Sequence, residues 1–144
     1  MFYFAYGSNM NRAQMAERCP GAIMEGTGVL PDREFRINRR GVATICESSE
    51  QNVHGVVWRI SEAHESTLDI CESVAEGRYR REFFQVSLEG GRSTESLVYV
   101  DPIAEAGVPR DGYLEKVITG AIEHGLPEAY IENSLQIWVR ANSG

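Results

Sequence analysis

The chain has 144 residues, of which 42% are hydrophobic and 24% charged, as is usual for a globular domain with a buried core. Its formal net charge of -7 argues against a nucleic-acid partner, which needs a clustered excess of lysine and arginine. Three cysteines without a Cys-x-x-Cys pair and three histidines give no metal-site pattern, and no apolar stretch suits a signal peptide or membrane span. We therefore expect one domain over residues 1–144, in the cytoplasm with reduced thiols, without a metal ion, nucleic acid or membrane partner.

The first element expected is a buried aromatic strand over residues 2–6, which stops at three turn-forming residues, Gly7-Ser8-Asn9. Helical spacing over residues 10–17 then predicts a short helix. Glycine permits backbone angles that expose amide N–H groups, and a helix start adds unpaired donors, so such a loop can bind a carboxylate. Such residues also end many strands as a plain turn, and the residues alone favour that interpretation.

Short strands with turn residues between them dominate the rest of the chain. Strands are expected over residues 21–30, 34–38, 42–46, 54–60, 80–88 and 96–100, the last two joined by a turn at 89–92. Ser61 is suited to cap a helix that ends near Cys71 or Glu72, and Asp111 to cap one that ends near Gly125. Pro127 starts a last helix, ending near residue 135. This order predicts an α+β fold, a single domain built as a small, partly closed β-barrel flanked by helices.

A carboxyl group suited to proton transfer lies at the end of the helix that Ser61 caps. The apolar face of that helix is expected to comprise Ala63, Thr67, Leu68 and Cys71. Glu72, four residues after Leu68, would border this face and be partly desolvated, which would raise its pKa. Spacing alone favours the other interpretation, an ordinary glutamate in the last turn of the helix that points to water.

Other polar and aromatic residues have plain structural explanations. Tyr79 and Tyr113 are expected to be packed aromatics, and Arg39-Arg40 and Arg78 to lie on a solvated face. No histidine has a partner at the spacing of a catalytic triad, and Cys71 is expected to be a buried helical thiol.

Together, segments in order from residue 2 to about 135 resemble the γ-glutamylcyclotransferase family. They are the strand and loop Phe2–Met10, Gly41–Ile45, His54–Trp58, Leu68–Val74 with Gly77 and Tyr79, and the helix from Tyr113 to Glu123-His124-Gly125-Leu126-Pro127. Two positions depart from the family pattern. Ser73 stands where a glycine usually follows the catalytic glutamate, and Met10 replaces a leucine.

The resemblance implies an enzyme, a transferase or lyase of glutathione metabolism, that cleaves a γ-glutamyl amide by intramolecular cyclisation. The products would be 5-oxoproline and a free amine or amino acid. It implies Glu72 as general acid and base, without a cofactor or an enzyme nucleophile. The substrate-binding residues that it implies are Tyr6, Gly7, Ser8, Asn9 and Tyr113.

Two other functions stay open. One is the same cyclisation on a γ-glutamylamine, such as a γ-glutamyl-lysine remnant, or on a γ-glutamyl group of a dedicated pathway. The other is a non-catalytic small-molecule-binding module of the same fold. A small γ-glutamyl compound is the expected partner, and the sequence leaves open whether the chain is a monomer or a homodimer.

Overall fold

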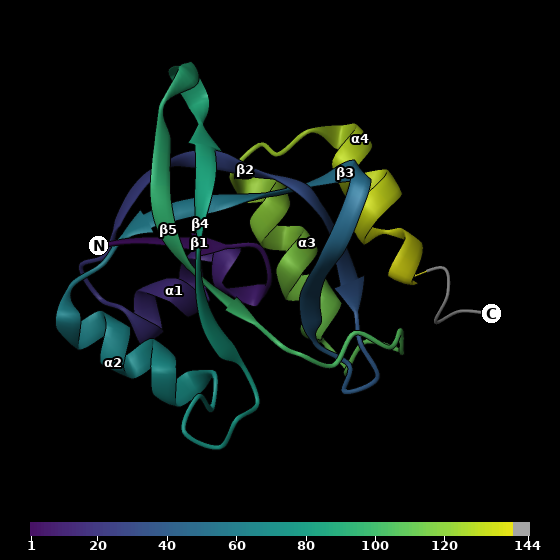
Figure 1. Ribbon diagram of the computed structural model, residues 1–144, viewed down its shortest axis with the longest axis horizontal. Coiled ribbons are helices and arrows are strands. Elements are labelled where there is room, and N and C mark those ends of the chain that lie inside the picture. The colour runs from purple at the N-terminus through teal and green to yellow at the C-terminus, as the bar shows by residue number, and fades with distance from the viewer. Residues whose placement is uncertain (140–144) are drawn as a thin grey trace.

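The computed structural model describes residues 1–139, in which five strands close into a barrel with helices against it (Figure 1). The strands are β1 (Phe2–Ala5), β2 (Ile23–Ile37), β3 (Ala43–Arg59), β4 (Arg80–Leu88) and β5 (Ser93–Val100). Their order around the barrel is β1-β3-β2-β4-β5. β1 pairs antiparallel with β3 and parallel with β5, where Phe2 lies opposite Ser96. The predicted α+β barrel is confirmed, and the sheet closes completely rather than in part.

The helices lie in the connections between strands and after the last strand. They are α1 (Arg12–Arg18), α2 (Glu62–Cys71), α3 (Tyr113–Glu123) and α4 (Glu128–Tyr130), with the 3₁₀ turns η1 (Ser8–Met10) and η2 (Glu89–Gly91) and a π turn, η3 (Ile131–Leu135). α1 and α2 lie side by side at one end of the barrel (Figure 1). Ser61 caps α2 as predicted, in a capping box with His64.

The start of α3 differs from the prediction. Gly112, not Asp111, occupies the N-cap position, with φ at 77° and no side-chain cap. This left-handed conformation favours glycine over aspartate. The Tyr113 N–H instead donates to the backbone carbonyl of Arg110 over 3.0 Å.

Four of the expected short strands are in fact two long ones, β2 and β3. Pro31 and Asp32 do not end β2, because the pairing with β3 continues across an irregularity between Pro31 and Arg33. The polar run over residues 47–52 also stays in β3, with mostly exposed side chains. Backbone pairing does not require apolar side chains, so polar residues failed to mark the strand ends.

One cluster of buried apolar side chains, drawn from all five strands and from the helices, forms the core. α3 packs against η1, and Gly120 makes this approach possible, since a Cβ there would lie 2.7 Å from backbone atoms of Met10 and Asn11. The contact fixes the position of α3 relative to the loop after β1.

Across residues 1–139, none of the helices combines the length and the apolar character needed to cross a bilayer.

Candidate active site

A cavity of about 390 Å³ lies where the end of β1, η1, the end of α2 and the start of α3 meet. The residues expected from the sequence to form the site all line it, namely Tyr6, Gly7, Ser8, Asn9, Glu72 and Tyr113. Within the part of the chain that the structure describes, no three His, Cys, Asp or Glu side chains are grouped to hold a metal ion.

Glu72 directly follows α2, at the C-cap position. The helix ends in a Schellman motif, in which the Ser73 N–H donates to the Ile70 carbonyl over 3.1 Å and the Val74 N–H to the Asp69 carbonyl over 3.0 Å. Ser73 takes the left-handed conformation of this motif, with φ at 52°, which glycine adopts without strain. The motif fixes the backbone from which the Glu72 side chain projects.

The Glu72 carboxyl group is more weakly acidic than usual. Burial raises its pKa from 4.5 to about 7, although the nearby Arg18 guanidinium opposes the shift. No side chain or backbone group within residues 1–139 forms a hydrogen bond or ion pair with it. A carboxyl group of this pKa is poised to accept and return a proton near neutrality.

Five phenols, those of Tyr3, Tyr6, Tyr79, Tyr99 and Tyr113, share the cavity wall with Glu72. Burial is the largest cause that raises the pKa of each, and for all but Tyr99 the negative charge of Glu72 raises the pKa further. For Tyr113 the result is a pKa of about 12. The phenols therefore stay neutral at physiological pH and line the wall with hydroxyl groups instead of charges.

Tyr113 is held over the start of β3, close to the loop after β1. Its hydroxyl oxygen accepts from the Ala43 N–H over 3.1 Å, and the Tyr79 hydroxyl donates to the Ala43 carbonyl over 2.8 Å. A Cβ on Gly7 would lie 3.1 Å from the Tyr113 hydroxyl. The φ of Gly7 is -109°, outside the left-handed region, so space and not backbone angle is the reason for glycine here.

A side-chain network fixes the loop that carries Ser8 and Asn9. The buried Asn9 amide donates to the Tyr3 hydroxyl over 2.9 Å. Its oxygen accepts from Gln14 at 2.9 Å and from Arg18 at 3.0 Å. Gln14 also donates to the Ser8 hydroxyl over 2.7 Å, so one face of α1 holds the loop in a single arrangement.

The apolar face expected for α2 is wrong. Leu68 is the only residue of the helix that is fully buried, whereas Ala63 and Cys71 are exposed. Cys71 is therefore not the buried thiol expected from its neighbours in sequence. It lines the cavity beside Glu72.

Polar contacts supply much of what holds α2 to the barrel. Asp69 accepts from the Tyr99 hydroxyl over 2.7 Å and from Arg81 over 2.8 Å, and Glu65 accepts from Arg81 over 3.2 Å. Asp69 lies in the last turn of the helix, three residues before Glu72, so these contacts help to orient Glu72.

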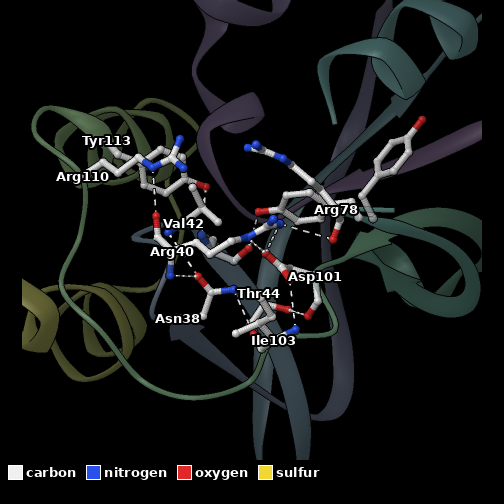
Figure 2. Close-up of polar contacts among 12 residues, drawn as sticks. Asn38, Arg40, Val42, Thr44, Arg78, Asp101, Ile103, Arg110 and Tyr113 are labelled. Carbon is white, nitrogen blue, oxygen red and sulfur yellow. Dashed lines mark hydrogen bonds and ion pairs between the residues drawn. The ribbon is translucent and has the colours of Figure 1, made fainter. Parts of the chain in front are cut away.

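A second polar network lies behind the cavity, around the fully buried carboxylate of Asp101 (Figure 2). Asp101 accepts from Arg40 at 2.5 and 3.0 Å and from the Ile103 N–H at 3.0 Å. Arg40 also donates to the Arg78 carbonyl over 3.3 Å, and Arg110 donates to the Arg40 carbonyl over 2.9 Å. Arg40 is therefore not on a solvated face as expected.

Sequence reasoning missed several residues of the cavity wall, among them Gln14, Arg18, Arg40, Arg78, Arg110 and Lys116. A signal existed for the first two, because they lie four positions apart on the helix that follows the Gly-Ser-Asn loop. Three of the others come from separate loops and Lys116 comes from α3, and nothing in their spacing indicates a common site.

Comparison with known proteins gives a consistent result. The AIG2-like family model matches residues 52–133. The γ-glutamylcyclotransferase of Mus musculus is 33% identical over 90% of this chain and 74% of that protein. The γ-glutamylcyclotransferase of Bos taurus is 32% identical over 89% of this chain and 73% of that protein.

The fold agrees with these sequence matches. A solved structure described as a γ-glutamyl cyclotransferase superposes with a TM-score of 0.85 at 30% identity, over 92% of this chain and 84% of that one.

Proposed function

The chain belongs to the AIG2-like family and, within it, to the γ-glutamylcyclotransferases, and from this premise we propose that it converts a γ-glutamyl amide into 5-oxoproline and a free amine or amino acid. The observation that carries this proposal is the raised pKa of Glu72 together with its location in the cavity. Its carboxyl group, with a pKa raised to about 7, lines the same cavity as the loop Tyr6-Gly7-Ser8-Asn9.

The substrate supplies its own nucleophile in this reaction. The α-amine attacks the γ-carbonyl carbon, a ring C–N bond forms, and the original amide C–N bond breaks. Holding the substrate in the folded conformation can lower the activation barrier by roughly 7–11 kcal/mol, because an intramolecular attack does not require two molecules to meet and align.

Glu72 would carry the proton that this exchange requires. Its ionised form takes a proton from the α-ammonium group, which frees the amine for attack. That proton then goes to the leaving nitrogen as the amide C–N bond breaks. The regenerated carboxylate accepts the second proton, which the ring nitrogen loses on becoming a lactam N–H, and this proton leaves with the amine, which is released as an ammonium ion. A positioned acid and base of matched pKa contributes typically about 10²–10⁴-fold in rate.

The loop after β1 would hold the glutamyl end of the substrate. We assign this role to the backbone N–H groups of Gly7, Ser8 and Asn9, with Tyr6 as part of the wall. Tyr113 would donate its hydroxyl proton to the substrate, since the Ala43 N–H contact uses only the oxygen of that hydroxyl.

We further propose a cytoplasmic location, where the three free cysteines would stay reduced, and a role in glutathione metabolism. Neither a metal ion nor an organic cofactor is part of the proposed reaction.

The direct test is 5-oxoproline release from a panel of γ-glutamyl dipeptides and γ-glutamylamines, read by mass spectrometry. We expect release from at least one compound, and a loss of about 10²-fold or more in the Glu72→Gln variant. Glu76→Gln is the matched control, because this exposed glutamate lies outside the cavity wall.

Near-normal turnover by a folded Glu72→Gln protein would contradict the role given to Glu72. Silence across the whole panel would favour a non-catalytic binding module of the same fold.

A further inference from the structure

The cavity is rich in positive charge although the chain as a whole is acidic. The chain has 14 lysines and arginines and 21 acidic residues, and five of the former but only two of the latter line the cavity. The cationic residues are Arg18, Arg40, Arg78, Arg110 and Lys116. A cavity of this charge attracts an anionic ligand.

These charges are not spread evenly over the wall. The floor consists of buried residues, namely Tyr3, Phe4, Tyr6 and Asn9. The mouth is formed by exposed residues, namely Arg78, Arg110, Asp111 and Lys116. If the glutamyl end lies against the loop after β1, as proposed above, the leaving amine extends toward the mouth and its three cationic side chains.

Four of the five cationic groups already have partners. Arg18 donates to the Asn9 amide oxygen, and Arg40 is paired with the buried Asp101 carboxylate. Arg110 donates to the Arg40 carbonyl over 2.9 Å, and Lys116 donates to the Gln14 side-chain oxygen over 3.4 Å. These contacts within the protein make the four groups less available to a substrate.

Arg78 differs from these four, because its backbone is hydrogen-bonded and its guanidinium group has no partner within residues 1–139. Its N–H donates to the Ser73 carbonyl over 3.1 Å, and its own carbonyl accepts from Arg40 over 3.3 Å. No partner for its guanidinium group exists among the described residues. Figure 2 shows this side chain extending away from the Asp101 network, with no dashed contact at its tip.

We propose that Arg78 determines the specificity for the leaving group, by binding a carboxylate that the released amine carries. The substrates would then be γ-glutamyl amino acids or γ-glutamyl peptides, and γ-glutamylamines without a carboxylate would be poor substrates. A guanidinium group suits this role, since its parallel N–H donors match the two oxygens of a carboxylate. The inference rests on the proposed cyclisation and adds the chemistry of its second product.

A matched pair of substrates isolates the carboxylate. γ-Glutamylalanine and γ-glutamylethylamine differ only by the carboxylate on the leaving amine. We expect wild-type kcat/KM for 5-oxoproline release to be higher for γ-glutamylalanine by about tenfold or more, the effect of one charge-assisted hydrogen bond.

Arg78→Gln should reduce this preference to less than about threefold, chiefly through a higher KM for γ-glutamylalanine, because a remote binding contact is lost. The kcat/KM for γ-glutamylethylamine should change much less than that for γ-glutamylalanine. Arg80→Gln is the control, since this exposed arginine lies two positions away and does not line the cavity. Equal kcat/KM for the two compounds in the wild type, or an unchanged preference in Arg78→Gln, would overturn the role of Arg78 while leaving the cyclisation intact.

Binding by the Glu72→Gln protein separates the two claims. Calorimetry with the same two compounds should give tighter binding of γ-glutamylalanine, and the double variant with Arg78→Gln should lose that difference. Such a result supports the subsite even if the wild type releases no 5-oxoproline, which would refute the proposed function alone. Equal binding of both compounds would overturn the subsite.

Discussion

Glu72 owes its raised pKa to its location in the cavity wall, since the nearest cationic influence, Arg18, acts in the opposite direction. The folded pKa of about 7 lies above the ordinary value of 4.5, so the folded protein holds an extra proton between these pH values. Stability therefore falls as the pH rises through this window, because an ionised Glu72 is costly to bury. Such a cost is common where a site is built for chemistry instead of stability.

Ser73, the next residue, carries a cost of its own that a substitution can reveal. Its left-handed conformation, with φ at 52°, is the one that favours glycine at the end of a helix. We expect Ser73→Gly to increase the free energy of unfolding by about 0.5–1 kcal/mol in urea denaturation, while Ser73→Ala leaves the strain in place.

The end of α3 allows the reverse substitution, from glycine to a residue with a side chain, as a control. Gly125 occupies the same position of a Schellman motif, with φ at 67°, and a Cβ there would meet no atom within 4 Å. Gly125→Ala should therefore cost about 1 kcal/mol through backbone strain alone. A Ser73→Gly protein no more stable than the wild type would refute this account of the α2 terminus.

At the scale of elements, the order of strands and helices could be predicted from the sequence, but strand lengths could not. Pro31 and the polar run over residues 47–52 mark turns in most chains, and here they lie within β2 and β3. Pairing with a partner strand decided these segments, and a single sequence does not reveal which partner is present.

The helix that leads to Glu72 shows the same limit. Its cap at Ser61 and its end at Cys71 follow from local chemistry and could be predicted. The side of the helix that faces the barrel could not be predicted, because it depends on contacts of Asp69 with Tyr99 and Arg81. These two residues belong to β5 and β4, which follow the helix in the sequence. The candidate site was predicted through the family resemblance, whereas spacing alone favoured a surface position for Glu72.

At the scale of the whole molecule, two neighbouring arginines form ion pairs that differ in burial. Arg40 pairs with Asp101, whose side chain is fully buried, and this pair joins the turn between β2 and β3 to the segment after β5. Arg39 pairs with Glu105 at 3.7 Å, with both side chains more than half exposed. Burial, and not the number of ion pairs, should decide which contact stabilises the fold.

Asp101→Ala should lower the free energy of unfolding by about 3–5 kcal/mol, since it leaves Arg40 and the Ile103 N–H without their partner. Glu105→Ala should change it by less than about 1 kcal/mol, because water screens the exposed pair. Urea denaturation of both variants measures the contrast. Equal losses in the two variants would show that the Asp101 network does not hold these segments together.

The central claim is that Glu72 moves the proton that ring closure requires, and the pH profile of kcat/KM for 5-oxoproline release tests it most directly. The account predicts that kcat/KM rises with pH through an apparent pKa of about 7, as Glu72 ionises, and that Glu72→Gln abolishes this rise together with the activity. A rise centred near the ordinary carboxyl value of 4.5, or the same profile in the Gln variant, would contradict it.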